Sequence, residues 1–220
     1  SWGGGVFSND ITITGSTVSG NSTAGSTSSG GGLSSFGTIT ITGSTISGNS
    51  TAGDYAYGGG IHGSGTITNT TISGNSTAGE NAYGGGVYGT FTVTDSIILG
   101  NVTSYDGVDY DELGGGNPTF SGSNIVGANN DVFDASAANV DNADPTAVFD
   151  STEANGTATA GVLADNGGDV ETIAILASGP ADGTGTGGAN IGSGPVVNAV
   201  PTITGLVSDL TVTEDVAGDL

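Results

Sequence analysis

One stretch rich in turn residues occurs three times along this chain. The stretch GSTVSGNSTAG at 15–25 returns as GSTISGNSTAG at 43–53 and as NTTISGNSTAG at 69–79. The triplet Gly-Gly-Gly begins at residues 3, 30, 58, 84 and 114, in steps of 27, 28, 26 and 30 residues. A fixed period with the same residue types at each phase is typical of solenoid proteins, in which successive coils stack on one another. We therefore expect coils of about 26–30 residues, with the triplets stacked at one corner.

Apolar residues hold a constant phase within this repeat. Three places before the asparagine of each unit stand Val18, Ile46, Ile72 and Ile98, and eight places before it stand Ile13, Ile41, Ile67 and Val93. They alternate with threonine, as in TITIT, and this period of two among β-branched residues predicts strands. Because a single coil cannot bury its inward face, stacking must do so, and we predict an all-β parallel solenoid with these eight residues as its core column.

Turn residues recur at fixed phases as well. Six places before the repeated asparagine stand Gly15, Gly43, Asn69 and Asp95, all residues that favour turns. The asparagines themselves are Asn21, Asn49, Asn75 and Asn101, and each follows a glycine. We expect their amides to bond to the copies above and below as a ladder. The sequence thus predicts that Asn49→Ala destabilises the fold, whereas the same change at Asn155, outside the column, does little.

The charge balance excludes several partners. The chain of 220 residues contains 22 acidic residues, one histidine and no lysine or arginine. Nucleic acids and anionic membrane surfaces require cationic side chains, so we expect neither as a partner. No apolar run is long enough to insert into a membrane, and there is no cysteine for a disulfide. Such an acidic chain suits a saline setting, where salt screens its self-repulsion, and its lack of lysine and arginine leaves no site for trypsin-like proteases outside the cell. The alternative is a simple bias of composition.

Several stretches resemble known families. GGGIHGSGTITNTTISGNSTAG, at 58–79, resembles the right-handed parallel β-helix repeats of bacterial surface proteins, including polymorphic outer-membrane-protein passengers. GVLADNGGDVETIAILASGPADG, at 161–183, is similar to the end of a choice-of-anchor Q β-helix domain, although Asp169 and Ile173 stand where that family has proline and histidine. The resemblance implies a right-handed parallel β-helix over residues 1–192 and a location on the bacterial cell surface.

Residues 193–220 have a different character. A linker with proline precedes PTITGLVSDLTVTED, which is similar to the opening of cadherin-like or Ig-like modules. We expect either the start of such a module or one extended strand that seeks a partner. In the second case an assembly strand would use Ile203, Leu206, Leu210 and Val212. Docked on the first coil of another copy, it would give a head-to-tail polymer; the alternative is a longer parent chain.

Two candidate ligand sites stand out. The loop SYDGVDYDELGGG carries Asp106, Asp109, Asp111 and Glu112. Carboxylates at this density could hold Ca²⁺, although the loop fails the EF-hand pattern and a solvated loop is the competing interpretation. Tyr57 and Tyr83 each precede a glycine triplet and should stack on neighbouring coils, where they could bind glycans or simply stabilise the sheet. We expect no other cofactor.

An enzyme is not expected. Lyase chemistry on this fold needs a strong base or cation, and hydrolysis needs two carboxylates on one face; the strands carry Thr and Ser instead. We therefore expect a structural extracellular or cell-surface protein, a rigid solenoid of an adhesin, stalk or filament. The alternative is a β-helix that binds or cleaves carbohydrate.

Overall fold

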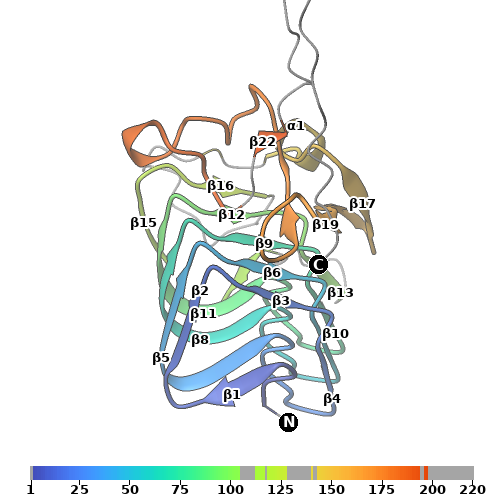
Figure 1. Ribbon diagram of the computed structural model, residues 1–220. Coiled ribbons are helices and arrows are strands. Elements are labelled where there is room, and N and C mark those ends of the chain that lie inside the picture. Colours follow the sequence, from blue (N-terminus) through green and yellow to red (C-terminus); the bar gives the residue numbers. More distant parts are fainter. Residues whose placement is uncertain are drawn as a thin grey trace, which may run out of the picture.

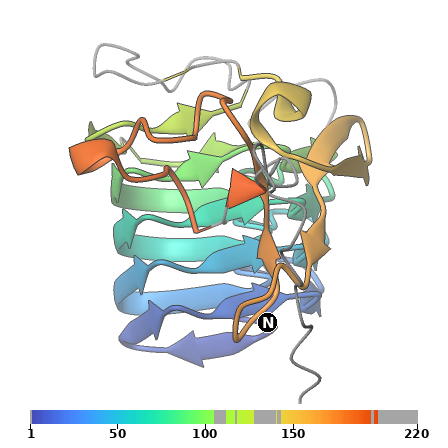
Figure 2. The same cartoon turned by 45° about the horizontal axis from the view of Figure 1, so that its top comes forward.

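The computed structural model describes residues 2–104, 112–116, 118–127, 140, 143–193 and 196–197. Within this part, parallel strands stack as a β-solenoid of about four turns (Figure 1). Figure 2 shows the coils as layers, with the segment after residue 143 along one side and at one end. The predicted all-β solenoid is confirmed. The tail at 198–220, including the predicted assembly strand, lies outside the described residues.

Three sheets run along the solenoid. The first sheet contains β1 (Val6–Ser8), β2 (Ile11–Thr14), β5 (Leu33–Thr42), β8 (Ile61–Thr68), β11 (Val87–Thr94), β14 (Leu113–Gly114) and β15 (Thr119–Ser121). The second contains β3 (Thr17–Ser19), β6 (Thr45–Ser47), β9 (Thr71–Ser73), β12 (Ile97–Ile98) and β16 (Ile125–Val126). The third contains β4 (Ser22–Ala24), β7 (Ser50–Ala52), β10 (Ser76–Ala78) and β13 (Val102–Ser104).

Identical residue types lie beside one another from coil to coil. In the first sheet Ile13 pairs with Ile41, and Ile41 with Ile67. Six residues of the predicted core column are fully buried: Ile41, Ile46, Ile67, Ile72, Val93 and Ile98. Ile13 and Val18, in the first coil, are only partly buried and pack against the same core. Each coil thus covers the apolar face of the next.

Left-handed backbone recurs at the predicted turns. In the column six places before the asparagines, φ is 51° at Gly15, 57° at Gly43, 45° at Asn69 and 47° at Asp95. Glycine adopts this conformation freely, and asparagine and aspartate tolerate it better than other residues with a side chain. The same left-handed turn conformation therefore recurs in these four coils, even where the residue changes.

The glycine triplets form a corner in which backbones approach closely. The first glycine has positive φ, for example 65° at Gly58, and a Cβ on the second, Gly59, would overlap the backbone carbonyls of Gly85 and Ser76. The fifth triplet does not belong to this corner, contrary to the even spacing expected from the sequence. Leu113 pairs with Val87, so the triplet that begins at Gly114 follows this strand position instead of preceding it.

The four asparagines form a directional ladder. The backbone N–H and the Nδ2 of Asn49 both donate to Oδ1 of Asn75, each at 3.0 Å, and Asn75 donates likewise to Asn101 at 3.0 and 2.8 Å. Nδ2 of Asn75 also reaches back to the carbonyl of Ile46 at 2.9 Å. Each buried amide therefore ties together three successive coils.

Asn155 is not the inert position that we expected from the sequence. Its Nδ2 donates to the carbonyls of Gly100 at 2.9 Å and Asn75 at 3.3 Å. It therefore fastens a later segment of the chain to the corner that carries the ladder. A substitution at Asn155 removes these two contacts, so it cannot serve as a neutral reference for the ladder.

Parallel stacking of coils extends to β16, and the following segment covers the solenoid. It comprises α1 (Pro145–Val148), β17 (Thr152–Asn155), β18 (Ala158–Gly161), β19 (Leu163–Ala164), β20 (Thr172–Ile173), β21 (Ile175–Leu176), a 3₁₀ turn (Thr186–Gly188) and β22 (Val196–Val197). Strands β17 and β18, and also β19 and β20, pair antiparallel, which the sequence did not predict. A second core forms here, with Phe149, Ile173 and Ile175 packed against Ile97 and Ile125 of the last coils.

The covering segment lies on the outer face of the second sheet (Figure 1). The hydroxyl of Thr45 bonds to that of Ser193 at 2.7 Å, and the N–H of Ser193 donates to Thr71 at 3.1 Å. Further along, Thr17 donates to the carbonyl of Glu171. Consequently Thr45 and Thr71, which point away from the solenoid interior, are almost fully buried.

Asp95 fastens this cover to the solenoid. Its Oδ1 accepts the N–H of Ser123 at 2.8 Å and that of Thr186 at 3.3 Å. Burial opposes the charged form and raises the pKa of the Asp95 carboxyl, but hydrogen bonds from the Thr186 side chain and from the two N–H groups outweigh it, so the pKa is lowered below its ordinary value of 3.8.

We expect Asp95→Asn to flatten the acid end of the stability curve. Because the folded pKa is lowered, ionised Asp95 contributes stability above the unfolded pKa and loses it as pH falls through the folded pKa. Urea unfolding can be measured from pH 6 down to about two units below the ordinary pKa of aspartate. Over this range the unfolding free energy should fall more steeply for the unmodified protein than for Asp95→Asn. The amide oxygen of the variant still accepts hydrogen bonds but does not titrate. Parallel curves for the two proteins would contradict this.

Candidate functional site

An aromatic ridge follows the outside of the glycine corner. Its members belong to four successive coils: Trp2, Phe7, Phe36, Tyr57, His62, Tyr83 and Tyr88. Trp2, Phe7 and Phe36 are 44%, 47% and 63% exposed, whereas the other four are partly buried. Such a continuous row of rings on the outside of a solenoid is an unusual concentration of apolar surface.

Strand register places the rings in two neighbouring columns. One column contains Tyr57 and Tyr83, which bridge in parallel and whose rings stack at 6.2 Å and 7°. The other contains His62 and Tyr88, paired between β8 and β11, with rings 5.7 Å apart at 9°. The columns touch where Tyr57 and Tyr88 approach to 4.5 Å.

In the second coil both column positions are serine, so neither column has a ring there. The aromatic contacts between the first and third coils are made by Trp2 and Phe36 instead. Ser29 and Ser34 are almost fully buried. The ring of Trp2 lies 4.9 Å from that of Phe36 and 6.0 Å from that of His62, two coils away. Phe36 stands on a β-bulge between Ser34 and Thr38, where the register of β5 and β8 shifts. The bulge adds the residue that completes the ridge.

The ridge carries no charge near neutral pH. Burial lowers the pKa of His62, so its imidazole is neutral there. Burial, and then the neighbouring Tyr88, Tyr83 and Tyr55, raise the pKa of Tyr57. The Nδ1 of His62 lies 3.5 Å from the hydroxyl of Ser34, which is too long for a strong hydrogen bond. The ridge can therefore stack against a ligand, but it offers no paired nucleophile and base.

Sequence reasoning identified only part of this ridge. The spacing of the triplets pointed to Tyr57 and Tyr83, which the structure brings together. Trp2 precedes the first triplet in the same way and could have been found by the same signal. The inclusion of His62 follows from its register with Tyr88 in the neighbouring coil. Phe36 depends on the bulge, for which the sequence offers no repeated pattern.

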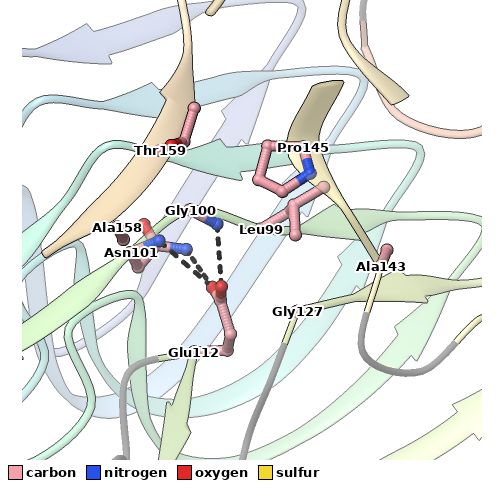
Figure 3. A pocket seen from close by; sticks show the side chains of 9 residues that line it. All are labelled: Leu99, Gly100, Asn101, Glu112, Gly127, Ala143, Pro145, Ala158 and Thr159. Atoms are coloured by element: carbon pink, nitrogen blue, oxygen red, sulfur yellow. Dashed lines mark hydrogen bonds between the residues drawn. The ribbon is translucent and has the colours of Figure 1, made fainter. Parts of the chain in front are cut away.

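A second feature is a buried carboxylate at the end of the asparagine ladder. Glu112 is 3% exposed, and its Oε1 accepts the N–H of Gly100 at 2.7 Å. Its Oε2 accepts from Nδ2 and the N–H of Asn101, at 2.6 and 3.3 Å (Figure 3). Glu112 thus receives the same two donors that each asparagine receives from the coil before it. An acceptor-only group is a suitable end for a ladder whose donors all point one way.

The backbone explains how Glu112 reaches this position. Its carbonyl accepts the N–H of Val87, as the carbonyl of Gly86 accepts that of Ile61. Glu112 therefore takes the place of the third glycine of a triplet, beside which the ladder asparagine lies in the other coils. The side chain fills the position that the next asparagine would occupy. A cavity of about 180 Å³ lies beside it, lined by Leu99, Gly127, Pro145 and Thr159 among others (Figure 3).

The predicted Ca²⁺ loop is only partly described. Asp106, Asp109 and Asp111 lie outside the described residues, and Glu112 points into the solenoid, where amides occupy both of its oxygens. Among the residues that the structure describes, no three acidic or histidine side chains gather into a metal-binding group. No helix in the same part of the chain has the length and hydrophobicity of a membrane span. Searches of family models, curated proteins and solved structures return no match to this chain.

Proposed function

We propose that this chain is a rigid structural segment of an extracellular or cell-surface protein, such as an adhesin, stalk or filament. The observation that carries this proposal is the pairing of like residues from coil to coil, which holds on both sides of the bulge in β5. Backbone pairing in three sheets, the isoleucine columns and the asparagine ladder all repeat along one axis. Cross-links of this kind in every coil resist bending and local opening.

The chemistry of the chain supports the same location. With 22 acidic residues and neither lysine nor arginine, it carries no site for trypsin-like proteases and repels other polyanions. The resemblance to choice-of-anchor Q domains and polymorphic outer-membrane-protein passengers, given above on residues 58–79 and 161–183, adds the expectation of a bacterial surface. Saline tolerance follows from charge screening.

The proposal includes assembly of subunits from head to tail. Within the described chain, β1, β3 and β4 each pair on one side only, and Ile13 and Val18 stay partly exposed at this edge. An apolar edge with unpaired backbone groups is a template for another strand or coil. A second copy could cover it through its own terminal coil or through residues 201–220.

Light scattering and electron microscopy of the full chain, and of a version without residues 201–220, test this. Polymers of the full chain that shorten on deletion would support strand donation. Unchanged polymers would contradict donation but leave coil stacking. A strictly monomeric full chain would contradict assembly, and the remaining explanation for the open edge would be further coils of a longer parent chain.

The aromatic ridge favours one alternative function, the binding of carbohydrate. Exposed aromatic rings present a large apolar face, against which the apolar face of a sugar ring can stack. The same full-length protein, applied to an array of neutral and acidic glycans with analysis of released products, separates the functions. No tight ligand and no cleavage is the result expected of a structural segment. A specific ligand lost in Tyr57→Ala would replace the structural proposal by glycan binding, and any bond cleavage would identify an enzyme.

A further inference from the structure

Threonine forms a regular array on the outer face of the first sheet. One column consists of Thr12, Thr40, Thr66, Thr92 and Thr119, each paired in register with the next. The column two residues further along consists of Thr14, Thr42, Thr68, Thr94 and Ser121. The array therefore spans five coils with one β-branched hydroxyl residue at nearly every point.

The structure leaves this array open to solvent. Thr12, Thr66, Thr92 and Thr119 are exposed, and Thr40 is partly exposed. A shorter third column, Thr38, Ser64 and Thr90, is exposed beside them. The covering segment of residues 143–193 makes its contacts on the second sheet instead, where it buries Thr45 and Thr71. One threonine face is thus covered and the other is left free.

The hydroxyls of the array are available to a ligand. Within the described residues, those of Thr12, Thr40, Thr66 and Thr92 have no hydrogen-bond partner. In the second column, hydrogen bonding among the described residues involves only the hydroxyls of Thr94 and Ser121, which lie 2.7 Å apart. Neither of the two five-coil columns contains a charged side chain; the shorter third column has Asp10 at its first-coil end, where its carboxylate accepts the N–H of Thr38. Charged groups would hold their own hydration shells, so their absence leaves a uniform surface of hydroxyl and methyl groups.

The spacing of the array is fixed by the sheet. Neighbouring strands lie about 4.8 Å apart, and residues two apart along a strand lie about 6.7 Å apart, twice the rise per residue. A flat solid with a similar two-dimensional repeat could contact every point at once. The oxygen lattice on the prism face of ice has repeats close to both of these spacings, and its open holes accept methyl groups.

From this match we propose that the outer face of β2, β5, β8, β11 and β15 binds ice. Each threonine contributes one weak contact, so affinity requires that many contacts form together. The in-register ladders hold the side chains in place before binding, which reduces the entropy lost on binding. The ligand is a neutral solid, so the net charge of −22 does not oppose it. A structural role on the cell surface and ice binding are compatible, and either can fail without the other.

Ice affinity of the full chain provides the test. When a dilute solution freezes slowly onto a cold probe, we expect the protein to be enriched in the ice, and the solution to show a gap between its melting and freezing temperatures. Thr66→Tyr, at the centre of the array, should reduce both signals several-fold, because one large side chain lifts the face from the lattice. Ala52→Tyr places the same ring on the exposed outer side of β7, on the third sheet, and should change neither.

Circular dichroism must first show that both variants fold. A folded full chain excluded from ice like an ordinary soluble protein would overturn the proposal. Equal ice affinity in Thr66→Tyr and the unmodified protein would overturn the assignment to this face. Retention of the chain on an insoluble neutral polysaccharide, without enrichment in ice, would show that the chain recognises a different solid and would also overturn the proposal.

Discussion

Replacing Gly59 by alanine should cost about 4 kcal/mol of unfolding free energy or more, at the upper end of the range for single substitutions. The added Cβ would overlap backbone atoms of Gly85 in one coil and Ser76 at the adjoining corner, and backbone cannot rotate away as a side chain can. Separation of the coils to make room would weaken the isoleucine column along the whole stack. Urea unfolding followed by far-ultraviolet circular dichroism measures the loss.

Two further alanines separate the causes of this loss. Gly168→Ala adds a Cβ whose only neighbour is the Val170 carbonyl at 3.8 Å, so it should be almost neutral. Gly15→Ala adds a Cβ with nothing within 4 Å but at a φ of 51°, which isolates the strain of left-handed backbone, about 1–2 kcal/mol. If Gly59→Ala costs no more than Gly15→Ala, the close approach of the coils is not what the glycine corner provides.

Removing the amide of Asn75 should have the second largest effect. Asn75→Ala takes the acceptor from the N–H and Nδ2 of Asn49 and the donor from the carbonyl of Ile46, all in the buried ladder. Each buried group left without a partner costs about 1–3 kcal/mol, so a total of about 3 kcal/mol is expected. The unfolding free energy, again from urea titration, is the measurement.

Asn21→Ala is the matched control. Asn21 occupies the same column but is partly exposed, and its Nδ2 donates to the Ser19 carbonyl and to Asn49. Water can replace those contacts, so the loss should be well under half of that at Asn75. Equal losses at the two positions would mean that the buried ladder is not a stabilising network. Asn49→Ala should resemble Asn75→Ala, because Asn49 is equally buried.

The repeat of about 27 residues carried enough information to predict the stacked strands and their register. In each unit the strand propensity, the turn residues and the spacing of the apolar residues all favour the same local structure, and the next unit repeats the same pattern. A shift of one residue would turn Ile41 or Ile67 outwards, so the alternation with threonine defines which side faces the interior. The corner glycines followed from the same repetition.

The end of the repeat was beyond sequence reasoning. The step of 30 residues to the fifth triplet signalled a change, but not that Glu112 would take a glycine position and end the ladder. Nor did the strand pattern reveal the antiparallel pairs of residues 152–173, or the role of Asn155. These features depend on contacts between residues far apart in the sequence, and each occurs once, so no repeated pattern marks them.

The threonines show most clearly which features the sequence determines and which the tertiary structure decides. The sequence determined that Thr66 and Thr71 both point away from the interior, because each alternates with a buried isoleucine. Only the tertiary structure decided that Thr66 is exposed while Thr71 is fully buried. The physical reason is that burial of an outward residue depends on what packs over it, and Ser193 reaches Thr71 from 122 positions along the chain.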